Sequence, residues 1–125
     1  MITRVQFKQL DWITGEGHTA QTASIVHVRG KCTRVDVVIS AVTGNPTVNV
    51  SFTDANALAI LPAFNALADG THHVKLAESH KAAQDADFNP MPFCDDTLTV
   101  SVDPSADPGG VDQTLTVDVY LYLED

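Results

Sequence analysis

The chain is poor in aromatic residues and in positive charge. Aromatic residues make up 6% of its 125 residues, and Trp12 is the only tryptophan. Seven Lys and Arg residues stand against 16 Asp and Glu residues, which gives a formal net charge of −9. Such a protein is repelled by nucleic-acid phosphate and by anionic membrane. We therefore expect no nucleic-acid partner and no membrane partner.

Cysteine and long apolar runs are also scarce. Cys32 and Cys94 do not form a CxxC pair, which disfavours a zinc site. No apolar run approaches the roughly 18 residues that span a membrane. The first residues also lack the apolar core of a signal peptide. We expect a protein made in the cytoplasm with two reduced, partly buried thiols, and a disulfide between them remains the alternative.

Signatures of catalysis and of cofactor binding are absent as well. No serine lies in a GxSxG elbow, and no GxGxxG or GxxxxGK loop is present to hold a phosphate group. Cys94 precedes Asp95 and Asp96, and this acidic setting disfavours a reactive thiolate. We expect no enzymatic activity, no catalytic residue and no cofactor.

The densest group of metal-binding residue types is His72, His73, Glu78 and His80. On a strand, His72 and His73 point to opposite faces, so both cannot easily bind one ion. The HExxH spacing of zinc enzymes is also missing. We therefore expect solvent-facing histidines and no metal ion.

The second candidate for metal binding is an acidic group that comprises Asp103, Asp107 and Asp112, with Asp95 and Asp96 nearby in sequence. Carboxylates are the ligands that calcium prefers, but no EF-hand pattern is present. Aspartate before proline is a common start of a turn, and two of these aspartates precede a proline. We predict ordinary turns here, and weak calcium binding is the alternative.

What the chain does have is strict alternation of apolar and polar residues. Residues 97–102 read TLTVSV, residues 114–123 read TLTVDVYLYL, and turn-forming residues lie between them. A period of two is typical of half-buried β-strands. We predict that these two strands pair as a closing β-hairpin.

The rest of the chain follows the same pattern at roughly ten-residue spacing. Gly30 and Lys31 suit a tight turn between two strands. Pro62 and Gly70 suit the two ends of a short helix over 62–69. The fold predicted is all-β, an antiparallel β-sandwich or jelly-roll-like domain of seven or eight strands. Residues 1–22 are predicted to form an N-terminal arm and loop, and residues 23–125 a single domain. Further strands are expected at 2–9, 23–29, 33–42, 47–53 and 71–76.

Alternation in the last strand also predicts a contact surface. Tyr120 and Tyr122 alternate with leucines, so their side chains face away from the core. Tyrosine suits protein interfaces because it combines an apolar ring with a polar end, and an ordinary cross-strand aromatic pair is the alternative. Together with Val5, Phe7 and Trp12 of the predicted arm, they are the expected interface residues.

Five stretches carry a likeness to a known group of proteins: VDVVIS, GNPTVNVSFTDANAL, FNPMPF, DTLTVSVDPSADPGG and TLTVDVYLYLED. In these the chain resembles small β-sandwich virion structural proteins of tailed bacteriophages, of the capsid cement or decoration type. The resemblance covers about residues 23–123.

The resemblance implies a protein that binds the outer shell and bridges neighbouring capsid subunits. It also implies synthesis in the host cytoplasm, a place at the capsid surface of the virion, and the major capsid protein or another virion protein as partner. A homo-oligomer is expected, with a trimer favoured. The alternatives are a carbohydrate- or receptor-binding module that depends on Trp12, a calcium-dependent adhesion module, and a small tail or neck protein.

Overall fold

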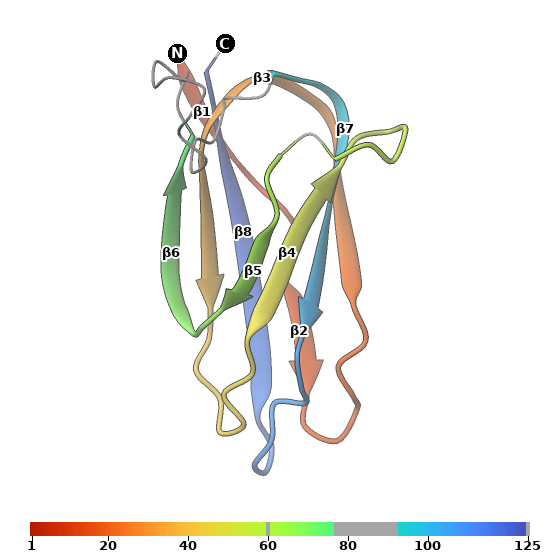
Figure 1. The fold of residues 1–125 in the computed structure, drawn as a ribbon, viewed down its shortest axis with the longest axis vertical. Coiled ribbons are helices and arrows are strands. Elements are labelled where there is room, and N and C mark those ends of the chain that lie inside the picture. The colour runs from red at the N-terminus through yellow and green to blue at the C-terminus, as the bar shows by residue number, and fades with distance from the viewer. Residues whose placement is uncertain (60, 77–92, 125) are drawn as a thin grey trace, which may run out of the picture.

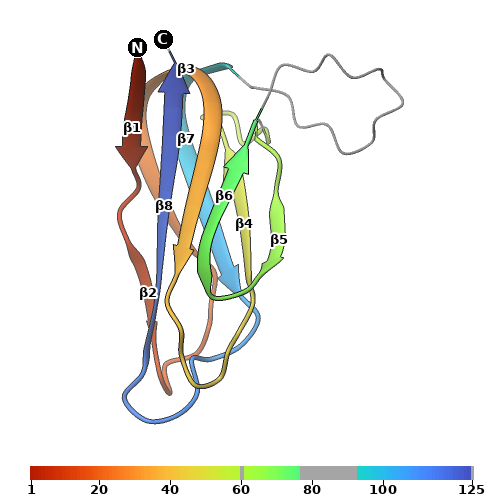
Figure 2. The same ribbon diagram turned by 90° about the vertical axis from the view of Figure 1, so that its left-hand side faces the viewer.

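The structure is a computed structural model that describes residues 1–59, 61–76 and 93–124. The strands in these ranges form one antiparallel sheet of eight strands, which curls strongly so that two layers face each other (Figures 1 and 2). This confirms the predicted all-β fold. The strands are β1 (Ile2–Gln6), β2 (Leu10–Ile13), β3 (Gln21–Ile39), β4 (Val48–Thr53), β5 (Phe64–Leu67), β6 (Gly70–Lys75), β7 (Phe93–Pro104) and β8 (Thr114–Glu124).

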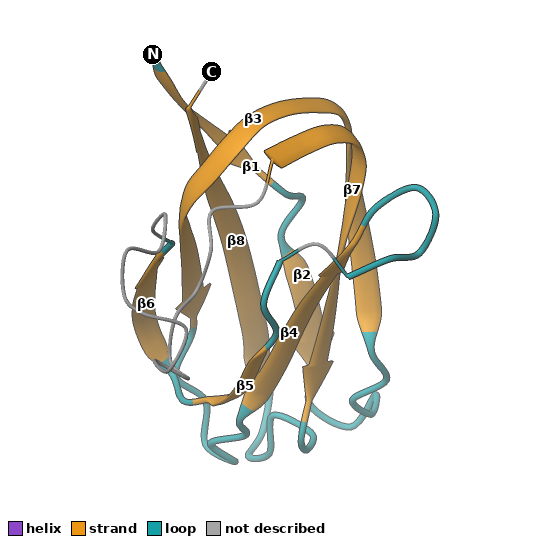
Figure 3. Cartoon of the chain, turned by 45° about the horizontal axis from the view of Figure 1, so that its top comes forward, coloured by secondary structure: helices purple, strands orange, loops and turns teal. Residues whose placement is uncertain are grey.

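The long strand β3 belongs to both layers. Its first half pairs with β7, and its second half pairs with β8 on one side and β6 on the other. The first layer therefore holds β1, β2, β8, the second half of β3, and β6. The second layer holds the first half of β3, then β7, β4 and β5. Figure 3 shows β3 arching from one layer into the other beside β7.

The turn predicted at Gly30 and Lys31 is wrong, because β3 bends there without reversing. Gly30 still pairs with Cys94, and its φ of 127° is one that few other residues adopt. A Cβ at this position would lie 2.9 Å from the carbonyl oxygen of Glu124. Glycine thus allows β3 to approach the end of β8 closely, while register shifts on either side of it produce the bend.

The predicted closing hairpin is also wrong, although both of its strands are present. β7 pairs with β3 and β4 in the second layer, whereas β8 pairs with β1, β2 and β3 in the first. Residues 105–113 carry the chain from one layer to the other. The apolar residues of both strands therefore point into the same core from opposite sides, and alternation alone does not distinguish this arrangement from a hairpin.

The core lies between the two layers and is filled mainly by alternate residues of the strands. Phe7, Phe52 and Phe64 form a chain of aromatic contacts, with ring centroids 6.1 Å and 6.2 Å apart. Burying one large apolar side chain of this kind stabilises a fold by about 1.5–3 kcal/mol. The largest fully buried aliphatic residues are Leu98, Leu115, Leu121, Val35, Val37, Val48, Val50, Val100, Val102 and Val117.

The short helix predicted over 62–69 is replaced by β5. Phe64 pairs with Val50 of β4, and its ring packs edge-on against Phe52 at an interplanar angle of 77°. Ala66 has a positive φ of 55°, which no regular α-helix contains. Burial of Phe64 against the core therefore outweighs the helix-end signals of the flanking proline and glycine.

The first 22 residues do not form a separate arm. β1 and β2 pair one after the other along β8, from Ile2 opposite Glu124 to Ile13 opposite Thr114. The two ends of the chain accordingly lie side by side at one pole of the molecule (Figure 1). Trp12, expected in the N-terminal arm and loop, lies on β2. Pairing with β8 makes this segment part of the sheet, in contrast to the arm predicted from sequence.

Candidate interaction surface

The outer face of the first layer carries both tyrosines of the chain. Along β8 every second residue is buried, and Tyr120 and Tyr122 alternate with them on the outside, half-buried. The predicted direction of these two side chains is confirmed. Pairing with β1 and β3 places arginines and an aspartate around them. We call this surface the tyrosine face; it comprises Arg4, Gln6, Arg34, Asp36, His73, Lys75, Asp118, Tyr120 and Tyr122.

Each tyrosine ring on this face is covered by an arginine. The guanidinium carbon of Arg4 lies 5.1 Å from the ring centroid of Tyr120. That of Arg34 lies 4.6 Å from the ring centroid of Tyr122. Cation–π contacts at exposed sites stabilise a fold by about 0.5–1 kcal/mol each. The contacts restrain two large side chains, which reduces the conformational entropy that a binding partner would remove.

Asp36 anchors the opposite side of the tyrosine face. Arg34 donates two hydrogen bonds to its carboxylate, from Nε to Oδ1 and from Nη2 to Oδ2, both at 2.7 Å. His73 Nδ1 lies 2.8 Å from Oδ1. The bonds from Arg34, assisted by His73, lower the pKa of Asp36 from 3.8 to about 2, against the opposing effect of burial. Asp36 is 5% exposed, so it is a buried carboxylate whose charge is compensated by its neighbours.

The remaining predicted interface residues lie deeper than expected. Val5 is half-buried, and Phe7 and Trp12 are 1% and 4% exposed in the core. The indole N–H of Trp12 donates to the carbonyl oxygen of Thr19 at 2.7 Å, so its polar group is satisfied within the chain. Phe7 and Trp12 are therefore core residues here, and Trp12 is not an exposed platform for a sugar.

Sequence reasoning did not find Arg4, Arg34 or Asp36. The signal for the last two was present, because both alternate with buried valines on β3 and must face outward. Their proximity to the tyrosines depends on strand register, which joins residues about 85 to 120 positions apart.

The outer face of the second layer has a different composition. It carries hydroxyl groups from three adjacent strands, and Ser24 Oγ lies 2.7 Å from Thr99 Oγ1. We call this surface the hydroxyl face; its cross-strand rows are Thr22–Ser101–Ser51 and Ser24–Thr99–Thr53. These rows contain no charged residue and no aromatic residue.

The histidines of the predicted metal group point in opposite directions, as alternation indicated. His72 lies opposite Val37 and contacts the carbonyl oxygen of Ala68 at 2.6 Å, whereas His73 lies on the tyrosine face. Glu78 and His80 lie outside the described residues. Over the ranges that the structure describes, no group of three or more His, Cys, Asp or Glu residues could hold a metal ion.

Asp107 connects two loops at one end of the molecule. Its carboxylate accepts hydrogen bonds from the backbone N–H of Gly109 at 2.8 Å and of Gly15 at 2.9 Å. These bonds lower its pKa. Asp103 and Asp112 are exposed and are not hydrogen-bonded to it. The geometry fits the predicted turn, with Asp107 joining residues 14–17 to residues 105–113.

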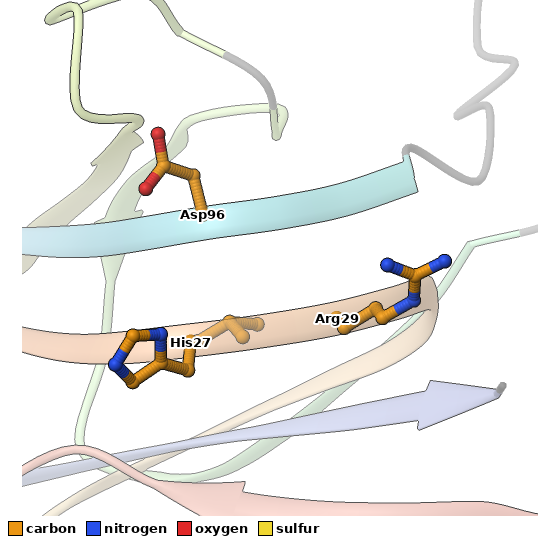
Figure 4. Close-up of a pocket in the computed structure, with 4 residues that line it drawn as sticks. His27, Arg29 and Asp96 are labelled. Atoms are coloured by element: carbon orange, nitrogen blue, oxygen red, sulfur yellow. The ribbon is translucent and has the colours of Figure 1, made fainter.

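A shallow hollow lies where the register of β3 shifts against β7. It is lined by His27, Val28, Arg29 and Asp96, and His27 has a φ of 58°. In Figure 4 the side chains of His27 and Asp96 point away from each other. The hollow therefore lacks the convergent polar groups that fix a small ligand.

Cys32 and Cys94 are both free and buried. Burial is the main cause that raises the pKa of Cys32 to about 12 and that of Cys94 to about 11. Both side chains are therefore protonated thiols at neutral pH, without the thiolate character of a nucleophile.

Comparison with known proteins adds little to the description of these surfaces. No family model matches the sequence, and no curated protein matches it. A solved structure, that of the infectious bursal disease virus VP2 subviral particle, is similar over 99% of this chain, with 11% sequence identity and a TM-score of 0.37. The chain spans 33% of the length of that protein. With a TM-score this low, the similarity does not carry a functional assignment. In the described residues, no helix is long and apolar enough to cross a membrane.

Proposed function

We propose that this chain is a phage capsid decoration protein, which binds the outer shell of the virion and stabilises it by bridging neighbouring subunits. The observation that carries the proposal is the tyrosine face. Tyr120 and Tyr122 are half-buried, covered by arginines and presented on a layer of paired strands. Tyrosine and arginine are the residue types that most often dominate the energy of protein interfaces.

The rest of the molecule agrees with a binding role without turnover. The sequence resembles small virion proteins of tailed phages, and the all-β sheet gives a rigid support for a contact surface. The net charge of −9 suits a position on the outside of a particle better than contact with packaged nucleic acid. The proposal names the major capsid protein or another virion protein as partner. It includes a homo-oligomer, with a trimer as the favoured state.

Binding to particles tests this proposal directly. Particles that lack the chain are mixed with purified protein, sedimented through a density gradient, and the bound copies are counted by mass spectrometry. We expect many copies per particle and a higher temperature of particle disruption. The variant Tyr120→Ser/Tyr122→Ser should bind at least about tenfold more weakly, because it removes both aromatic side chains from the contact.

The matched control lies on the other layer. Thr99→Ala/Ser101→Ala also removes two outward side chains from a central strand, and it should bind as the wild type does. Circular dichroism and thermal melting confirm that both variants fold. If the wild-type protein stays with small soluble species, the decoration role is wrong.

A further inference from the structure

The strand register of the first layer places three positive side chains in one row. Arg4 lies opposite Tyr122, Tyr122 lies opposite Arg34, and Arg34 lies opposite Lys75. The row crosses four strands from one edge of the layer to the other and contains no carboxylate. It holds three of the seven Lys and Arg residues in a chain of net charge −9. A basic row on an acidic protein is the charge pattern that needs explanation.

Among the described residues, ion pairs within the chain account for only one of these three charges. Arg34 is bound to Asp36 through two hydrogen bonds. Within the described ranges, neither Arg4 nor Lys75 lies within ion-pair distance of a carboxylate, and both are exposed. Arg4 is positioned over Tyr120, a contact that uses the face of the guanidinium and leaves its N–H groups at the edge able to donate.

We propose that this row, Arg4–Tyr122–Arg34–Lys75, binds an extended acidic segment of the partner protein. Adjacent strands lie about 4.8 Å apart, so the two uncompensated charges at its ends are about 14 Å apart. Carboxylates four residues apart on one face of an extended segment are separated by about 13 Å and reach both ends. Between these two ends lie Tyr122 and Arg34, whose guanidinium covers one face of the Tyr122 ring and leaves the ring edge to contact the partner.

The overall charge of the chain selects among anionic partners. A nucleic acid presents a long, uniform line of phosphates, and the net charge of −9 opposes its approach. A short acidic segment on a protein engages the row locally, within the screening distance of about 8 Å at physiological salt. The inference rests on the proposed decoration function for the identity of the partner, but its chemistry can be tested separately.

The first experiment measures particle binding as a function of salt concentration. Arg4→Gln and Lys75→Gln each remove one charge from the row, and each should weaken binding about fivefold to tenfold in low salt and have little effect near 1 M salt. Lys8→Gln is the control, because Lys8 is also exposed, lies outside the row, and loses the same charge. If the wild type binds and all three variants match it at every salt concentration, the acidic partner is wrong and the decoration role stands.

The second experiment applies if the wild-type protein does not bind particles, in which case the decoration role fails. A synthetic peptide with glutamate at every fourth position in a threonine background is titrated against the isotope-labelled chain and followed by NMR. Shifts confined to the outer residues of β1, β8, β3 and β6, and absent with the glutamine version of the peptide, would support the row as an acidic-segment site. No shift with the acidic peptide, or shifts only with a single-stranded oligonucleotide, would overturn it.

Discussion

The tyrosine face and the hydroxyl face are the two outer sides of one curled sheet, yet they present different kinds of side chain to water. The rows Thr22–Ser101–Ser51 and Ser24–Thr99–Thr53 show that short hydroxyl side chains are enough for a β-surface in contact with water. The tyrosine face instead holds large rings and a buried carboxylate. Water does not require such groups, and this contrast supports the proposed role of the tyrosine face in recognition.

The largest effect that separates the two faces is expected at Asp36. The side chain of Asp36 is 7% exposed, and Asp36→Ala leaves Arg34 and His73 without their shared acceptor. We expect a loss of about 2 kcal/mol in the free energy of unfolding, below the range for fully buried pairs because Arg34 is 35% exposed. Urea denaturation measures it, with Ser101→Ala on the hydroxyl face as control and a change within about 0.5 kcal/mol expected there. Equal losses for the two variants would remove the energetic distinction between the faces.

The carboxylate of Asp36 also makes the stability of the fold depend on pH. The pKa of Asp36 falls from 3.8 to about 2 on folding, so its contribution is fully present above about pH 4 and is lost as the pH falls toward 2. We expect the melting temperature of the wild type to fall more steeply over this window than that of Asp36→Asn. Asp107 also has a lowered pKa, so both proteins should carry Asp107→Asn to isolate the effect. If the melting temperatures of the two proteins change equally with pH across this window, the ionised form of Asp36 is not stabilised in the folded chain.

A smaller effect is expected from the ring stacking. Tyr122→Leu keeps an apolar side chain on β8 but removes the ring beneath Arg34, which lies 4.6 Å from its centroid. The free energy of unfolding should fall by about 0.5–1 kcal/mol. Tyr122→Phe retains the ring and serves as the control, with a change near zero. A double-mutant cycle with Arg34→Met isolates the pair, and a coupling energy of zero would contradict the stacking interpretation.

The smallest effect is expected on the hydroxyl face. Thr99→Val removes the hydroxyl group that meets Ser24 at 2.7 Å but keeps the β-branched shape that suits a strand. The change in unfolding free energy should lie within about 0.5 kcal/mol, because water replaces this exposed hydrogen bond. Thermal melting checks the expectation. A loss above 1 kcal/mol would mean that the hydroxyl rows are a structural network of their own.

The sequence predicted strands better than it predicted their partners. Alternation in residues 97–102 and 114–123 located β7 and β8 and the outward direction of Tyr120 and Tyr122. It did not show that the two strands lie in opposite layers, because an inward apolar row has the same period in either arrangement. Sequence also does not distinguish a glycine at a bend within one strand, as at Gly30, from a glycine in a hairpin turn.

Only part of the candidate site could be predicted from sequence, for a related reason. Its tyrosines were visible from local alternation, whereas Arg4 and Arg34 join them through pairing across most of the chain length. Phe7 and Trp12 were expected at the interface but are buried, because the segment that follows β1 and the strand β2 both lie along β8 and direct these side chains into the core. Local pattern gives the direction of a side chain, and the residues that surround it come from long-range register.

The pairing of Ile2 with Glu124 has a mechanical consequence. Because the chain's two ends lie side by side at one pole, a force that pulls them apart acts on the bonds between β1 and β8 one after another, as in a zipper. A force applied along the strands from opposite poles would instead load many backbone hydrogen bonds at once. A tether or cargo fused at either end would leave from that pole and leave both outer faces uncovered.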